Sequence, residues 1–382
     1  MHAAVFNRLI AKSLAKHLPL NVHMDLTYRC NERCVHCYLD HEDYGEMTTA
    51  EVLAVLEDLA AAGTLFLTFS GGEIFLRQDF FTLLEAARRL HFDLNLKSNG
   101  LLITGERAVR LRELGVAKMQ VSIYSADAAV HDGITGVAGS HARSLQAVRL
   151  LKQAGVSVKI ACPLMKQNAN GHAAVLRLAD ELGVPCVLDM TITPKMDGHR
   201  GLLELRNDAQ ELLPVLQDGK LNPLPDAGAC IHDGDHYDNI PCSAGHNSCY
   251  ISPYGDVYPC VQMPLPTGNV RKQSFAEIWY GSAEMLRVRE VRESSLEICS
   301  ACSIRAYCHR CPGIAYLEDG DLTGPSERAC ELAEANARLA GVREPVSEWH
   351  RRKNFRPEKS RTPFTILAST HSVRQPSKCE GA

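Results

Sequence analysis

The stretch that decides the fold is Asn21–Cys37, which reads NVHMDLTYRCNERCVHC. Its first half is a strand-like run, and Cys30, Cys34 and Cys37 follow directly. Three thiolates in one short loop can fill three corners of a cubane iron–sulfur cluster and leave one iron open to a further ligand. A zinc knuckle is the alternative, but zinc sites usually come as paired Cys-x2-Cys units. The spacing therefore favours an iron–sulfur centre.

Strand-like and helical patterns alternate from residue 21 to residue 192. Strands are expected at 21–28, 65–70, 92–98, 118–124, 157–162 and 185–192, and helices at 48–62, 79–90, 104–114, 140–154 and 170–182. Most of these helices are followed by a glycine suited to a left-handed cap, at Gly63, Gly115, Gly155 and Gly183. This alternation predicts an α/β fold, and right-handed crossovers curl its parallel sheet into a complete or partial (β/α)6 barrel. Sites in such sheets form where the strands end.

Composition limits the classes of protein to consider. The chain has 382 residues, a net charge of −4 and 45% hydrophobic residues, which is ordinary for a globular protein. No stretch approaches the roughly 20 apolar residues of a membrane span, and the amphipathic start lacks the features of a secretory signal. Fifteen cysteines without such a signal favour iron–sulfur or metal ligation in a reducing cytoplasm. The acidic main body argues against nucleic-acid binding.

The chain divides into five parts. We expect an N-terminal helix at 1–20, a barrel core at 21–201, a linker at 202–227, a cysteine-rich domain at 228–335 and a basic, disordered tail at 336–382. Nine of the fifteen cysteines lie between 228 and 330, where long periodic segments are few. This region is therefore expected to be a separate domain held together by its cysteines.

The motifs of the first 200 residues resemble those of the radical S-adenosylmethionine (SAM) family. The cysteine loop has His36 at the position of the family's aromatic residue, with Tyr38 just beyond. Further matches stand at the predicted strand ends and in the fourth long helix: Gly71, Gly72 and Glu73, then Ser98 and Asn99, then Ser122, then Arg143. The sequence departs from the family's Gly-Gly-Glu-Pro motif at Ile74.

This resemblance implies a chemistry. Cys30, Cys34 and Cys37 would hold a [4Fe-4S] cluster whose open iron is chelated by SAM, and the other matched residues would contact the SAM amino and carboxylate groups. One electron from the cluster would cleave SAM to a 5′-deoxyadenosyl radical, which abstracts a hydrogen atom from the substrate. The protein would supply binding, orientation and exclusion of water.

The cysteine-rich region resembles the SPASM extension of radical SAM enzymes. The resemblance implies two auxiliary iron–sulfur clusters, one held by Cys242, Cys249, Cys260 and Cys311 and the other by Cys299, Cys302, Cys308 and Cys330. Two residues separate Cys308 from Cys311 where the family has three, and Cys230 is an alternative to Cys249. A double zinc ribbon is the other interpretation, because Cys-x2-Cys pairs also indicate zinc.

The resemblance favours an enzyme that modifies a ribosomally made precursor peptide. Its expected partners are that peptide, a separate peptide-recognition protein and a low-potential electron donor such as flavodoxin or ferredoxin. Two alternatives stay open. One is a cofactor-biosynthesis enzyme acting on a haem or quinone-cofactor precursor, which shares the same two-domain plan. The other is a non-catalytic redox protein with several clusters, which would have no need of Gly71, Gly72 and Glu73.

Overall fold

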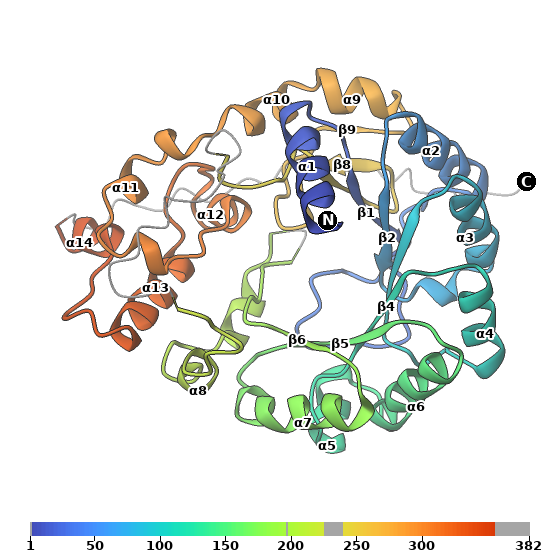
Figure 1. Cartoon of the computed structure of the whole chain (residues 1–382), viewed down its shortest axis with the longest axis horizontal. Helices are drawn as coiled ribbons and strands as arrows, with labels where there is room; N and C mark the ends of the chain where they lie inside the picture. The colour runs from blue at the N-terminus through green and yellow to red at the C-terminus, as the bar shows by residue number, and fades with distance from the viewer. Residues whose placement is uncertain (1, 196–197, 225–239, 356–382) are drawn as a thin grey trace, which may run out of the picture.

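A curved parallel sheet forms the centre of the molecule in the computed structural model, which describes residues 2–195, 198–224 and 240–355. Its first strands are β1 (Asn21–Thr27), β2 (Phe66–Gly71), β3 (Asp93–Ser98), β4 (Lys118–Ser122), β5 (Val158–Pro163) and β6 (Cys186–Asp189). Each strand pairs in parallel with the next one along the chain. Figure 1 shows the sheet bending around an interior, which confirms the predicted α/β fold of partial-barrel type.

Helices cover the outer face of this sheet (Figure 1). They are α2 (Thr49–Ala61), α3 (Phe80–Arg89), α4 (Gly105–Glu113), α6 (Ser140–Gln153) and α7 (His172–Leu182), whereas α5 (Ala128–Thr135) packs against α6. α2 begins at a capping box, in which Thr48 and Glu51 satisfy each other's backbone N–H groups. Gly63, Gly115, Gly155 and Gly183 follow their helices at φ of 91°, 66°, 80° and 62°, as the sequence predicted.

The two faces of the barrel sheet differ in polarity. Apolar residues of the strands, such as Met24, Phe69 and Leu96, pack with the outer helices in the main hydrophobic core. The alternate positions are polar, and they include His23 and Asp25 on β1 and Lys97 on β3. Parallel strands are usually apolar on both faces, because helices cover both. A polar inner face therefore marks the barrel interior as a place for a ligand.

The cysteine-rich part continues the barrel sheet. β7 (Ser248–Ile251) pairs in parallel with β1, and β8 (Asp256–Tyr258) and β9 (Gly268–Asn269) follow it in antiparallel order. The nine strands form one sheet in the order β6-β5-β4-β3-β2-β1-β7-β8-β9. Backbone hydrogen bonds between β1 and β7 therefore join the cysteine-rich part to the barrel.

The rest of the chain is helical. α8 (Leu213–Leu216) lies in the linker, and α9 (Phe275–Gly281), α10 (Ala283–Glu290), α11 (Glu297–Ser300), α12 (Pro312–Asp319), α13 (Glu327–Leu339) and α14 (Glu348–Phe355) follow β9. Short 3-10 turns are η1 (Ile74–Leu76), η2 (Ala169–Gly171), η3 (Gly201–Leu205), η4 (Glu293–Ser295) and η5 (Arg305–Tyr307). Residues 336–355 were predicted as tail, but α13 extends to Leu339 and α14 packs on α11 and α13. Cys230 and residues 356–382 lie outside the described residues.

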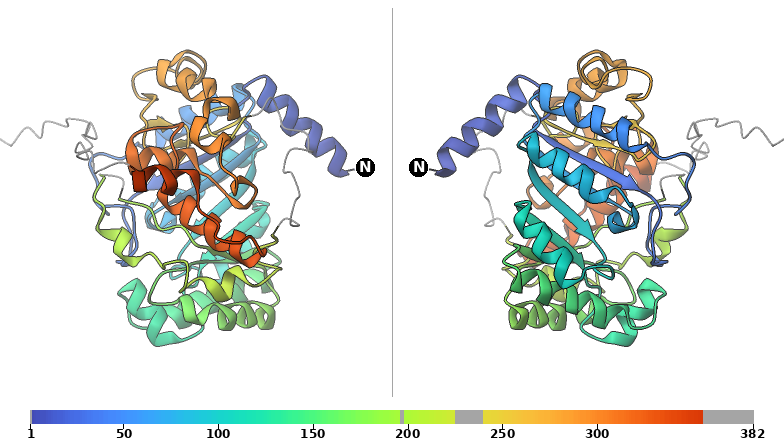
Figure 2. Two further views of the ribbon diagram at one scale, coloured as in Figure 1. Left: turned by 90° about the vertical axis from the view of Figure 1, so that its left-hand side faces the viewer. Right: turned by 90° about the vertical axis from the view of Figure 1, so that its right-hand side faces the viewer.

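The N-terminal helix α1 (His2–Ala15) projects from the body of the molecule, as Figure 2 shows. Its C-terminal end is held by the cysteine-rich part. Asn247 Nδ2 donates to Ser13 Oγ at 2.9 Å, and the indole of Trp279 donates to the carbonyl of His17 at 2.6 Å. In the described ranges, no helix combines the length and apolar character that crossing a membrane requires.

Candidate active site

Cys30, Cys34 and Cys37 lie in the loop that follows β1, at the carboxyl end of the barrel strands. Burial raises the pKa of Cys30 to about 12 and also raises the pKa of Cys34 and of Cys37. Each charged thiolate would raise the pKa of a neighbouring thiol in the loop, so the three groups lie close enough to repel one another. Buried thiols of this kind ionise when a positively charged centre binds them.

Helix α5, which the sequence analysis did not predict, holds the cysteine loop in place. The backbone N–H of Arg33 donates to the carbonyl of Thr135, and that of Val35 donates to Ile134, both at 2.9 Å. The N-cap residue of α5 is Asp127, whose side chain accepts from two backbone N–H groups, and its C-cap is Gly136, with φ 70°. An N-cap aspartate followed by a left-handed glycine could have revealed this helix from the sequence.

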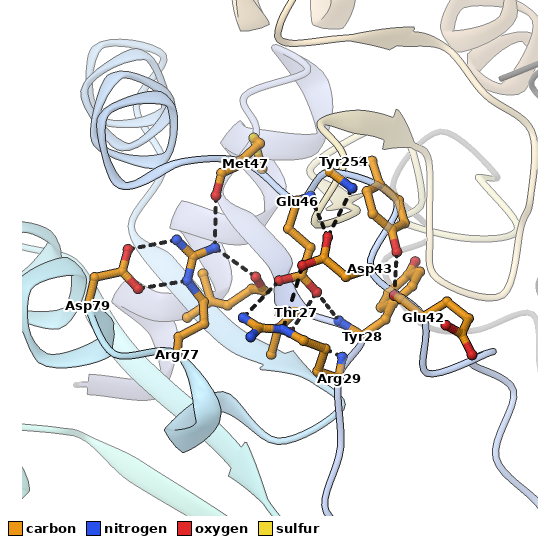
Figure 3. A network of polar contacts seen from close by, with 12 residues as sticks. Thr27, Tyr28, Arg29, Glu42, Asp43, Glu46, Met47, Arg77, Asp79 and Tyr254 are labelled. Carbon is orange, nitrogen blue, oxygen red and sulfur yellow. Dashed lines mark hydrogen bonds and ion pairs between the residues drawn. The ribbon is translucent and has the colours of Figure 1, made fainter. Parts of the chain in front are cut away.

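Glu46 fixes the start of the cysteine loop, as Figure 3 shows. Its carboxylate accepts from Thr27 Oγ1 at 2.6 Å and from the backbone N–H of Tyr28 at 2.8 Å. The guanidinium of Arg29 contacts the other carboxylate oxygen at 3.2 Å. The segment after the cysteines thus folds back and binds the end of β1, which restricts the movement of the loop.

Arg77 ties the same region to the second strand. Its guanidinium donates to the carbonyls of Leu26 and Met47 at 2.9 and 3.0 Å, while Asp79 accepts from its other nitrogens (Figure 3). Arg77 is 7% exposed, so this ion pair is largely shielded from water. The sequence analysis missed both Glu46 and Arg77, since nothing local marks an arginine that caps a distant strand end.

Gly71 and Gly72 let the end of β2 approach the cysteine loop closely. A Cβ atom on Gly71 would lie 2.1 Å from the carbonyl oxygen of Thr27, and one on Gly72 would lie 2.2 Å from that of Arg29. The backbone N–H groups of Gly72 and Glu73 donate to these two carbonyls at 2.8 and 2.9 Å. Gly71 also has φ 124°, which disfavours any side chain.

Glu73 is buried, and its carboxylate links the ends of β2 and β3. It accepts from Ser98 Oγ and from the backbone N–H groups of Asn99 and Phe75. The Asn99 side chain in turn reaches the cysteine loop, where Nδ2 donates to Asn31 at 2.7 Å and lies 3.8 Å from Cys30 Sγ. The predicted SAM contacts of the first three strands therefore form one connected group, in which Glu73 acts on Ser98 and Asn99.

Tyr124 connects the fourth strand to the cysteine loop. Its hydroxyl lies 3.7 Å from Cys34 Sγ and also hydrogen-bonds Ser122, the predicted contact at the end of β4. The ring of His36 packs edge-on against Tyr124 with centroids 4.9 Å apart. Burial lowers the pKa of His36 to about 4, so His36 is neutral near pH 7.

The other two predicted SAM contacts differ in exposure. Arg143 is exposed on α6, where its Nε donates weakly to Gly139 at 3.4 Å, and its charge acts on the buried Glu32 of the cysteine loop. Burial and the Asp25 charge raise the pKa of Tyr38, which is half-buried beneath the loop. Both therefore belong to the surroundings of the cysteine loop.

Cys242, Cys260 and Cys311 form a second group of thiols. Cys242 and Cys260 pack in one small hydrophobic cluster, and the Cys311 charge raises the pKa of both. Cys249 packs instead in the main core, at 3% exposure. It interacts with Cys260 electrostatically, but its side chain belongs to a different packing cluster from that of Cys242. The structure therefore brings together three of the four cysteines predicted for this site.

Cys299, Cys302, Cys308 and Cys330 form the third group, as predicted from the resemblance. The pKa of Cys308 and of Cys330 is raised to about 12, mainly by burial and in part by the charges of the other thiols of the group. The segment before α14 covers this group. Ser347 hydrogen-bonds Cys330, and the backbone N–H of Glu348 lies 3.5 Å from Cys302 Sγ.

The donor set of these groups fits iron–sulfur clusters. In the described ranges, no three Cys, His, Asp or Glu side chains already stand in the arrangement of a bound metal ion. The three groups nevertheless consist of thiols that are half-buried, or buried in the case of Cys330, and the groups at Cys30 and at Cys302 have backbone N–H groups directed at sulfur. Such donors stabilise cluster sulfur and tune its potential.

Comparison with known families agrees with this geometry. Residues 24–179 match the model of the radical SAM superfamily, and residues 242–303 match the SPASM iron–sulfur cluster-binding domain. This chain is a radical SAM enzyme with a SPASM domain. The radical SAM enzyme therefore carries a [4Fe-4S] cluster and SAM in its barrel, together with further iron–sulfur chemistry in its SPASM domain.

Curated relatives of this radical SAM enzyme belong to two groups. An AdoMet-dependent heme synthase of Methanosarcina barkeri is 28% identical over 79% of this chain and 94% of its own length. A PqqA peptide cyclase of Granulibacter bethesdensis is also 28% identical, over 83% and 88% of the two chains. The solved structure of SuiB of Streptococcus suis, bound to precursor peptide SuiA, superposes with a TM-score of 0.64 at 16% identity, covering 87% and 81%. At this identity, the SuiB likeness shows the fold.

Proposed function

We propose that this radical SAM enzyme modifies a ribosomally made precursor peptide. The observation that carries the proposal is the polarity of the barrel interior. Thr68 on β2, Asn95 on β3 and Gln120 on β4 line the interior with hydroxyl and amide groups. Such groups match the donors and acceptors of a peptide backbone, whereas a flat aromatic macrocycle is better held by apolar surface. The similarity to a peptide cyclase supports the same substrate class.

The proposed roles of the residues follow from their positions. Cys30, Cys34 and Cys37 hold the [4Fe-4S] cluster that, with SAM, supplies a hydrogen-abstracting radical. Gly71 and Gly72 shape the backbone beside the SAM amino group, and Glu73 keeps Ser98 and Asn99 in place. Ser122 and Arg143 would contact the SAM carboxylate, as the resemblance implies. Tyr124 and His36 exclude water from the cysteine loop by packing against each other.

The SPASM domain is proposed to hold two auxiliary clusters. One is placed at Cys242, Cys260 and Cys311, while Cys249, the fourth ligand that the resemblance implies, lies in the main core. The other is placed at Cys299, Cys302, Cys308 and Cys330. A flavodoxin or ferredoxin would deliver the low-potential electron in the cytoplasm. A separate peptide-recognition protein would present the precursor peptide.

The test combines iron counting with two activities. After anaerobic reconstitution, about twelve irons are expected for three [4Fe-4S] clusters, with a loss of about four in the Cys30→Ala/Cys34→Ala/Cys37→Ala variant. Reduced wild type should form 5′-deoxyadenosine, and the variant should not. Co-expression with a precursor peptide encoded beside the gene should change the peptide's mass only with the wild type. SAM cleavage without any peptide change would count against the peptide assignment.

A second candidate function rests on the heme synthase relative, which matches over 94% of its own length. In this reading the substrate would be a haem precursor. Stoichiometric binding of a tetrapyrrole by the reconstituted enzyme, and its conversion under reducing conditions with SAM, would favour this reading over the peptide.

A further inference from the structure

A cavity of about 770 Å³ opens at the amino-terminal ends of the barrel strands, opposite the cysteine loop. One wall is apolar and comes from Phe6, Ile10 and Leu14 of α1. Phe6 is 48% exposed and meets the ring of Phe66 edge-on, with centroids 6.2 Å apart. The opposite wall consists of polar strand residues, so the cavity is amphipathic. Figure 2 shows how far α1 extends beyond the sheet at this end.

Three lysines from neighbouring strands line this cavity. They are Lys97 on β3, Lys118 on β4 and Lys159 on β5. Burial lowers the pKa of Lys97 and of Lys159. Charge repulsion also lowers both pKa values, from Lys159 on Lys97 and from Lys118 on Lys159. Asp93 is the carboxylate on the cavity wall, and it accepts from the Asn95 side chain at 3.1 Å. The charge of the lining is therefore positive.

Lys97 has no ion pair within 4.0 Å among the residues that the structure describes. The nearest acidic groups that favour its charge are Asp25 and Asp189. Asp25 is fully buried, and its carboxylate is already hydrogen-bonded to the hydroxyl of Tyr250 at 2.9 Å and to the ring of His23 at 3.1 Å. A half-buried cation without an ion-pair partner is less favourable than one that is paired. A ligand that brings a carboxylate to Lys97 would remove that cost.

We propose that this cavity binds an acidic segment of the substrate peptide, an inference that rests on the proposed function. Glu or Asp side chains of the peptide pair with Lys97 and Lys159 in the interior and with Lys118 at the mouth. Apolar neighbours of these acids pack on Phe6 and Ile10. A strand of six residues spans about 20 Å and neighbouring strands lie about 5 Å apart, so a short extended segment is long enough to contact lysines on three neighbouring strands.

The test uses two labelled peptides of equal length, one alternating Glu with Leu and the other Gln with Leu. Fluorescence anisotropy is measured on the anaerobically reconstituted full-length enzyme. The Glu peptide should bind more tightly than the Gln peptide. Lys97→Gln and Lys159→Gln should each weaken Glu-peptide binding about tenfold, as expected for loss of one charge-assisted hydrogen bond. Lys272→Gln, at an exposed position of the SPASM domain, is the matched control and should not change it.

The dependence of peptide binding on ionic strength distinguishes the contribution of the interior lysines from that of Lys118 at the mouth of the cavity. Lys118 is exposed, so the effect of Lys118→Gln should shrink as ionic strength rises, whereas the effect of Lys97→Gln should persist. Iron content and thermal unfolding of each variant show that the fold is retained. If Lys97→Gln loses iron or unfolds at a lower temperature, Glu-peptide binding by Lys159→Gln is the deciding measurement.

Three results would overturn the inference. They are equal binding of the Glu peptide by all variants, failure of the wild type to bind it, and lysine-dependent binding of coproporphyrin III, a tetracarboxylate, in place of the peptide. The precursor-peptide assay separates this inference from the proposed function. Unchanged KM for precursor modification in Lys97→Gln and Lys159→Gln would refute the acidic site and leave the peptide function intact. Absence of any peptide modification by wild type would refute the function itself.

Discussion

The carboxylate of Glu73 accepts a hydrogen bond from the hydroxyl of Ser98, whose oxygen lies 3.0 and 2.8 Å from the two carboxylate oxygens. This contact joins the ends of β2 and β3 directly beside the cysteine loop. Because two backbone N–H groups also donate to it, Glu73 is largely occupied by the protein. We therefore expect Glu73 to position Ser98 and Asn99 and not to bind the cofactor through its carboxylate.

We expect Glu73→Ala to lower the free energy of unfolding by several kcal/mol. The substitution leaves the Ser98 hydroxyl and the N–H groups of Asn99 and Phe75 without an acceptor, at about 1–3 kcal/mol each. Urea denaturation of the anaerobic protein measures the loss. Ser98→Ala is the matched control, because it removes one donor and should cost only about 1 kcal/mol. Equal effects of the two variants would contradict a central role for the carboxylate.

Gly72→Ala should disrupt the active site. The added Cβ would lie 2.2 Å from the carbonyl of Arg29, so the end of β2 must move away from the cysteine loop. Loss of SAM-dependent 5′-deoxyadenosine formation together with lower iron content is the expected result. Gly133→Ala serves as the control, because Gly133 is exposed on α5 with open space around it. That change should preserve activity and leave stability equal or slightly higher.

Acid should destabilise the fold through His131. Burial lowers the pKa of His131 to about 4, and its Nδ1 accepts the backbone N–H of Tyr124 at 3.1 Å. Between pH 6.5 and pH 4 the unfolded chain binds a proton that the folded chain does not, so stability falls as pH falls through this window. The contribution of this one group is about 3 kcal/mol.

His131→Asn tests this linkage. Asn can accept the same backbone N–H without titrating, so the variant should lose part of the pH dependence of the unfolding free energy. Unfolding by urea at pH 7 and at pH 5 gives the two values to compare. An unchanged pH dependence in the variant would show that another group is responsible.

We expect the iron content of cysteine variants of the SPASM domain to depend on where each cysteine packs. Cys242→Ala removes a thiol from the group that includes Cys260 and Cys311, and we expect it to lose up to about four irons. Cys249 lies in the main core, so Cys249→Ala should lower stability through lost packing and retain more iron than Cys242→Ala. Iron and sulfide analysis after identical reconstitution gives the ranking. Equal iron loss in both variants would establish Cys249 as a ligand.

Two truncations test the role of the C-terminal helix. Ending the chain before Val346 removes α14 and the Ser347 contact with Cys330, and it exposes the group around Cys302. Iron content should fall by up to about four atoms, because one cluster site loses its cover. A second truncation after Phe355 keeps α14 and should retain full iron content. If both truncations keep all their iron, α14 does not protect the site.

Much of the barrel follows from local patterns in the sequence. Each predicted strand overlaps an observed one within a few residues, because apolar runs and glycine caps act over short distances. α5 was missed, since its eight residues are too few for a clear helical period. α14 was assigned to a disordered tail because its composition is basic and polar, and contacts with α11 and α13 overrode that preference.

Local sequence alone predicts an iron–sulfur site at the cysteine loop, because its three thiols lie within eight residues of one another. How the cysteine loop is held depends on contacts between segments that are distant in the chain. Glu46 and Arg77 bind the end of β1 from other segments, and β7 joins the SPASM domain to the barrel sheet. Lys97, Lys118 and Lys159 stand far apart in the chain, and the parallel register of β3, β4 and β5 brings them to one cavity. Such contacts depend on strand order and register, which no local pattern encodes.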